Sequence, residues 1–239
     1  MTNRYPRFGV GGAIGLLLLV FGGGGCYLFQ KSETFYGLKT AGQKVVFVVD
    51  ISGSMEGKNE GSLESRAVGM AVQGAGSAVS NAIGGSLGSF VGTQTTSEVT
   101  KLGGAKRELI PAIQGLPESS SFSIITFGND TKPWMMGMVP ASATNTGMAA
   151  AFVKQLEANG GTPARQALEK AFGYQDVGVV FFVSDGKPTD SSAAEILGRV
   201  RTLNAGRRVT VSTVGLGGDQ DEGFLTALAA ENGGRYVKK

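Results

Sequence analysis

The chain has no histidine and one cysteine among its 239 residues. Without histidine it cannot form a Ser-His-Asp or Cys-His catalytic group, and it cannot bind a metal through imidazole. A single cysteine excludes an intrachain disulfide and a cysteine-based zinc site. Any bound metal must therefore be held by oxygen atoms.

Charged residues are also scarce, at 17% of the chain, against roughly 25% in soluble domains. The 22 basic and 19 acidic residues give a net charge of +3, and the basic residues are scattered rather than gathered in one stripe. This pattern argues against nucleic acid as a partner. Glycine is abundant instead, with 39 residues, about twice the ordinary share.

Residues 8–29 carry no charge and follow a tail, residues 1–7, that contains Arg4 and Arg7. A helix of this length crosses a hydrocarbon core of about 30 Å. We expect a single-pass transmembrane helix in the cell membrane, followed by a linker at residues 30–43. The short basic tail favours a domain outside the cytoplasm. A cleaved signal peptide is the alternative.

The remainder of the chain alternates between apolar strands and amphipathic helices. Strands are indicated at residues 45–49, 122–127, 177–184 and 209–214, with a short edge strand at 131–138. Helices are indicated at residues 101–113, 148–156, 164–172, 193–203 and 224–230. Continuous apolar strands are typical of a parallel sheet covered on both faces. We therefore expect an α/β fold with a doubly wound, mostly parallel sheet flanked by helices over residues 44–239.

Oxygen-bearing side chains follow two of these strands. Asp50, Ser52 and Ser54 come directly after the first strand, and Gly53 permits a tight turn that points them to one spot. Asp185 follows the strand at residues 177–184. If the two strands are neighbours that leave the sheet in opposite senses, their terminal carboxylates meet at its carboxyl edge.

A third segment, Gly160-Gly161-Thr162-Pro163, precedes a predicted helix. Taken alone, Thr162 reads as a helix N-cap. Taken alone, the serines after Asp50 fit a turn that caps a helix, and Asp185 fits the same role. Their order and context together favour a shared site.

Asp50, Ser52, Ser54, Thr162 and Asp185 match the motif of the von Willebrand factor A domain, which this chain resembles from about residue 45 to its end. The resemblance implies a metal-ion-dependent adhesion site formed by these five residues. Two carboxylates and three hydroxyls suit Mg²⁺, or else Mn²⁺ or Ca²⁺. Hydroxyl ligands leave the cation electrophilic, so we expect a partner protein to present an Asp or Glu carboxylate to it.

The expected function is thus a non-enzymatic, membrane-anchored module for metal-dependent protein binding or adhesion. The alternative is a scaffold or regulatory subunit of a larger assembly, such as a chelatase-type ATPase system.

The sequence departs from the family in a glycine-rich insertion at about residues 56–100, which separates the Asp50 loop from the first helix. A flexible insertion and a helix with small residues every fourth position both fit it.

Overall fold

The structure, a computed structural model, describes residues 34–40, 44–57 and 100–239. In these ranges no helix is long and apolar enough to cross a membrane. The transmembrane helix expected at residues 8–29 and nearly all of the glycine-rich insertion lie outside the described residues, so both stay predictions. The domain occupies the compact unit Ser32–Lys239.

A seven-stranded sheet forms the centre of the domain, in the order β5-β4-β3-β7-β8-β9, with β6 also paired to β4. The strands from β4 to β9 along this order are parallel, whereas β5 and β6 pair antiparallel with β4. The sheet is therefore mostly parallel, as the sequence predicted. Its strands are β3 (Lys44–Asp50), β4 (Ser121–Phe127), β5 (Thr131–Pro133), β6 (Val139–Pro140), β7 (Val179–Ser184), β8 (Thr210–Gly215) and β9 (Gly233–Lys238).

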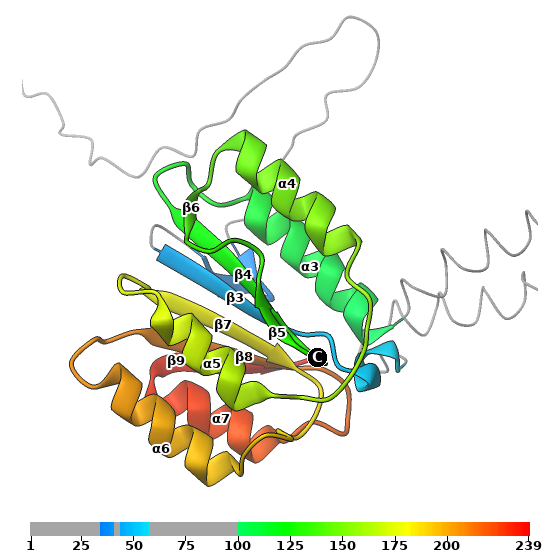
Figure 1. The fold of residues 1–239 in the computed structure, drawn as a ribbon, viewed down its shortest axis with the longest axis vertical. Coiled ribbons are helices and arrows are strands. Elements are labelled where there is room, and N and C mark those ends of the chain that lie inside the picture. The colour runs from blue at the N-terminus through cyan, green and yellow to red at the C-terminus, as the bar shows by residue number, and fades with distance from the viewer. Residues whose placement is uncertain (1–33, 41–43, 58–99) are drawn as a thin grey trace, which may run out of the picture. The chain divides into compact units, whose positions relative to one another are not determined.

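Helices cover both faces of the sheet (Figure 1). The first face packs against α3 and α4, and the second against α5, α6 and α7. Strand β3 is buried on both sides because Val45, Phe47 and Val49 face the first layer while Val46 and Val48 face the second. The helices are α3 (Lys101–Gln114), α4 (Ala143–Lys154), α5 (Ala164–Gly173), α6 (Ala193–Asn204) and α7 (Glu222–Glu231).

The direction of the chain connections reverses between β3 and β7. From β3 the chain passes through α3 to β4 on one side, whereas from β7 it passes through α6 to β8 on the other. The two strands are direct neighbours, with Val49 paired to Val183. In sheets of this type, ligands bind outside the carboxyl ends of the strands at such a reversal. The loops that follow β3 and β7 therefore meet there.

Part of the expected linker at residues 30–43 belongs to the folded domain. A hairpin of β1 (Thr34–Phe35) and β2 (Leu38–Lys39) packs against the first face of the sheet. Phe35 has no exposed surface, and its ring lies 5.3 Å from that of Phe47 and 5.5 Å from that of Phe181. The linker prediction was wrong for these residues because two-residue strands leave too short a pattern to read.

The bounds of one predicted strand and one predicted helix differ from those in the structure. The edge strand expected at residues 131–138 ends at Pro133, and residues 134–137 form bends. Helix α4 begins at Ala143, five residues before the expected start, and Ser142 caps it by accepting a hydrogen bond from the Asn145 amide. Met148, the first residue of the expected helix, is 45% exposed. Small side chains rather than large ones form the buried face of α4, which consists of Thr146, Ala149, Ala150 and Val153.

The insertion leaves and re-enters the domain at one place. Gly57 ends the turn after the 3-10 helix η1 (Gly53–Glu56), and Lys101 begins α3. The Lys101 amide donates a 2.9 Å hydrogen bond to the Gly57 carbonyl. The two ends of the intervening segment are thus already adjacent in the folded domain.

This adjacency predicts that the domain folds without the insertion. Replacing residues 58–99 by two glycines should preserve the sheet and keep the melting temperature within about 4 °C of the intact chain, which corresponds to roughly 1 kcal/mol for a domain of this size. Circular dichroism and thermal melting would measure both. A deletion variant without a cooperative transition would contradict the placement of the two ends.

Candidate metal site

Asp50 lies at the carboxyl end of β3 and has no exposed surface. Its Oδ1 accepts a 2.7 Å hydrogen bond from the Ser52 amide, and its Oδ2 accepts one of 2.6 Å from the Ser184 hydroxyl. Ser184 ends the neighbouring strand β7. Each oxygen of the Asp50 carboxylate therefore has a fixed orientation before any ligand arrives.

The loop after Asp50 turns its hydroxyls toward β7. The Ser52 and Ser54 hydroxyls lie 3.0 Å apart, and Ser54 Oγ donates a 2.8 Å hydrogen bond to Asp185 Oδ1. Met55 follows with no exposed surface, which anchors the turn in the core. The sequence prediction that residues 50, 52 and 54 point to one region near Asp185 is in agreement with this arrangement.

Thr162 reaches the same region from the loop between α4 and α5. A Cβ atom at Gly186, the residue after Asp185, would lie 3.7 Å from Thr162 Oγ1 and 3.8 Å from Ser54 Oγ. Thr162 is 5% exposed. The structure thus brings all five candidate residues together at the carboxyl edge of β3 and β7.

Thr162 does not act as the N-cap of α5. The helix has Pro163 at its N-cap position and no capping hydrogen bond from that side chain. Asp190 takes this role from the loop after β7, because its carboxylate accepts hydrogen bonds from the Arg165 and Gln166 amides at 3.2 and 3.0 Å. The capping interpretation of Thr162 was therefore wrong.

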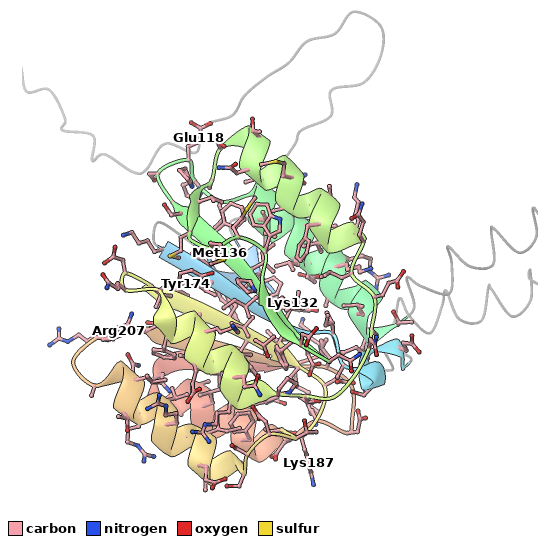
Figure 2. The ribbon with its side chains drawn as sticks, in the orientation of Figure 1. Glu118, Lys132, Met136, Tyr174, Lys187 and Arg207 are labelled. Carbon is pink, nitrogen blue, oxygen red and sulfur yellow. The ribbon has the colours of Figure 1, made fainter. Side chains whose placement is uncertain are left out.

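The loop after β7 also holds the backbone of Thr162. Thr189 Oγ1 accepts a 3.0 Å hydrogen bond from the Thr162 amide, and the Thr189 amide donates one of 3.0 Å to the Thr162 carbonyl. Lys187, in the same loop, points away from the domain into solvent (Figure 2). Sequence reasoning missed Thr189 and Asp190, since their partners lie more than twenty residues away.

A close backbone junction joins the Asp50 loop to the Thr162 loop. The Gly53 amide donates a 2.9 Å hydrogen bond to the Gly160 carbonyl. Gly160 has a φ of +89°, and a Cβ atom there would lie 2.3 Å from the backbone nitrogen of Asn129. Only glycine fits this position. The junction fixes the spacing between the Asp50 and Thr162 loops.

Burial raises the pKa of Asp50 from its ordinary 3.8 to about 6, while hydrogen bonds from Ser184 and Ser52 oppose the rise and the charge of Asp185 adds to it. Ion pairs among the described residues include none to Asp50. A buried carboxylate without a cationic partner is costly to keep charged. A bound cation would remove this cost.

Lys101 adds an ammonium group that the sequence analysis did not foresee. Its Nζ donates hydrogen bonds of 2.8 Å to Asp185 Oδ2 and 2.7 Å to Asp219 Oδ1. Burial opposes the charged form of Lys101, but the two carboxylates outweigh it and raise the lysine pKa. The hydrogen bond from Lys101 in turn lowers the pKa of Asp219.

The donor set fits a hard divalent cation. The described ranges contain no group of three or more Asp, Glu, His or Cys side chains placed to hold a metal ion together, and the candidate set consists of two carboxylates and three hydroxyls. Oxygen ligands of this kind suit Mg²⁺ or Mn²⁺ with some water retained. Asp50, Ser52, Ser54, Thr162 and Asp185 are the residues that would hold the cation.

Comparisons with known proteins agree with the fold. The chain is 26% identical over 212 residues to human inter-alpha-trypsin inhibitor heavy chain H4, a match that covers 83% of this chain and 18% of that protein. The chain thus spans less than a fifth of the length of this curated relative. An aerotolerance-related membrane protein from Bacteroides fragilis has a similar structure, with a TM-score of 0.56 at 15% identity over 83% of this chain and 92% of that one.

A second solved structure comes from the mussel byssus. Proximal thread matrix protein 1, with a zinc-occupied MIDAS motif, aligns with a TM-score of 0.51 at 14% identity, over 82% of this chain and 41% of that one. At these identities the two structures support the fold alone. The sequence model of the von Willebrand factor type A domain matches residues 96–238, which is more than half of the chain. The chain therefore belongs to the von Willebrand factor type A domain family.

Proposed function

We propose that this domain binds a divalent cation at Asp50, Ser52, Ser54, Thr162 and Asp185, and that the cation captures a carboxylate of a partner protein. The observation that carries the proposal is a pair of buried carboxylates, Asp50 and Asp185, at the reversal point of the sheet. Three hydroxyls surround them. Proteins of this family mediate protein-protein interaction, and the mussel protein has zinc in the corresponding motif.

The chemistry suits binding rather than catalysis. The cation would supply a positive centre that prefers oxygen ligands, and an Asp or Glu side chain from a partner is the strongest ligand a protein can offer it. The residues of this chain orient the cation and balance its charge. We further propose that residues 8–29 anchor the domain in the cell membrane and that the domain faces away from the cytoplasm.

A second candidate is the role of scaffold or regulatory subunit in a membrane-associated assembly, such as a chelatase-type ATPase system. The aerotolerance-related membrane protein that shares this fold is named as a membrane protein, and the anchor expected at residues 8–29 would place this domain at a membrane as well. In this case the same metal site would connect subunits. The two candidates differ in the partner, not in the chemistry of the site.

The metal proposal predicts stabilisation by Mg²⁺ or Mn²⁺. A cation that binds the native state alone should raise the free energy of unfolding by about 2.7 kcal/mol at a hundredfold excess over its dissociation constant. Asp50→Ala and Asp185→Ala should abolish the increase in melting temperature. Asp176→Ala is the matched control, since this exposed carboxylate pairs with Lys44. Equal stabilisation of the wild-type protein and both site variants would refute the proposal.

The capping geometry predicts that a substitution at Thr162 affects metal binding, whereas a substitution at Asp190 affects stability. Thr162→Val should weaken Mn²⁺ binding several-fold while the melting temperature of the metal-free protein changes little, because Asp190 caps α5. Asp190→Ala should instead lower the free energy of unfolding by about 1 kcal/mol. Calorimetric titration and thermal melting measure the two effects. Unchanged metal affinity in Thr162→Val would remove Thr162 from the ligand set.

Partner capture tests the two functions against each other. Full-length protein isolated with Mg²⁺ should retain a partner that EDTA releases and that Asp185→Ala does not bind. Mass spectrometry then identifies it: an ATPase subunit favours the assembly role, and another protein favours adhesion. A partner that stays bound in EDTA would show that the domain uses a different surface.

A further inference from the structure

Lys101 is buried beside the candidate metal site although its side chain carries a full charge. Only 7% of the side chain is exposed, and its Nζ bridges Asp185 and Asp219. A buried ammonium is costly unless hydrogen-bonded carboxylates surround it. The two short hydrogen bonds, of 2.8 and 2.7 Å, meet that requirement. The lysine therefore occupies a defined position.

The surrounding backbone is shaped to admit this side chain. A Cβ atom at Gly217 would lie 2.6 Å from Lys101 Cε and 3.0 Å from its Nζ. Gly217 has a φ of +78°, a conformation that favours glycine. Thr100 fixes the other end of the residue, because its hydroxyl accepts a 3.0 Å hydrogen bond from the Gly103 amide and caps α3. The lysine stem thus runs from the first residue of α3 to the loop after β8, where Gly217 leaves the space that it occupies.

The two oxygens of Asp185 face different groups. Lys101 binds Oδ2, whereas Oδ1 accepts the hydrogen bond from Ser54, a candidate metal ligand. Oδ2 of this carboxylate therefore binds the lysine, and Oδ1 faces the candidate metal site. The charges around the site are three carboxylates, Asp50, Asp185 and Asp219, and one ammonium, so a divalent cation would bring the sum to zero.

We propose that Lys101 is a resident counter-ion of the site. It holds the Asp185 carboxylate in a fixed orientation through the 2.8 Å hydrogen bond to Oδ2, and its charge opposes that of the incoming cation. This inference rests on the proposed function, since it concerns the same metal. Lys101 is a positioning residue whose positive charge also lowers metal affinity. The same charge makes the metal-loaded site less negative, and so more receptive to a partner's carboxylate.

The proposal predicts opposite effects from the two members of the ion pair. Lys101→Met keeps the apolar stem but removes the charge, so Mn²⁺ should bind on the order of tenfold more tightly. The metal-free protein should melt at a lower temperature, because Asp185 loses its cation. Asp219→Asn keeps Lys101 but removes an exposed negative charge, so Mn²⁺ should bind about twofold to threefold more weakly. If Lys101 only supported the local structure, both variants would weaken binding.

The experiment is a Mn²⁺ titration of the full-length protein, with free Mn²⁺ followed by electron paramagnetic resonance and metal-free melting recorded alongside. Lys101→Arg should bind Mn²⁺ like the wild-type protein, and Lys44→Met, which removes an exposed lysine at the other end of β3, should change neither readout. Equal or weaker binding by Lys101→Met overturns the proposal. If that variant does not fold, Asp219→Asn decides, and unchanged or tighter binding overturns it.

Failure of this inference is distinguishable from failure of the proposed function. If the wild-type protein binds Mn²⁺ and Asp50→Ala does not, the metal site stands whatever the Lys101 variants do. If the wild-type protein binds no Mn²⁺, the metal site and the counter-ion role are both overturned.

Discussion

Two carboxylates buried side by side at the end of a parallel sheet form the constraint on which the rest of this site depends. Asp50 and Asp185 leave neighbouring strands and have no exposed surface. Burial, together with the nearby charge of Asp185, raises the pKa of Asp50. The surrounding structure compensates with directed donors: Ser52 and Ser184 bind one carboxylate, and Ser54 and Lys101 bind the other. A divalent cation is the remaining group that would complete this balance.

The loops that hold these donors are tied to one another rather than to the sheet alone. The loop after β7 caps α5 through Asp190 and fixes Thr162 through Thr189. The Asp50 loop meets the Thr162 loop at the Gly53–Gly160 hydrogen bond. A displacement of any one of these loops would therefore also move the residues that the other loops contribute to the site. This construction explains how five residues spread over more than 130 positions can keep a common geometry.

The sequence predicted the elements whose pattern is local. Strand β3 could be recognised because five consecutive apolar residues are buried on both faces, and the motif residues could be located because they follow strand ends. The Phe35 hairpin was missed since its strands are two residues long. The start of α4 was placed five residues too late because small residues such as Ala149 and Ala150 form its buried face, whereas Met148 is exposed. Lys101 could not be connected to Asp185, since 84 residues and the insertion boundary separate the two partners.

The central claim is that Asp50 and Asp185 share a divalent cation. The most direct measurement is the anomalous X-ray scattering of Mn²⁺ in crystals of the domain. Our account predicts one strong anomalous peak in contact with oxygen atoms from this site, at the carboxyl edge of β3 and β7. Crystals with intact β3 and β7 loops and Mn²⁺ in the surrounding solution, but no anomalous peak beside Asp50, would contradict it.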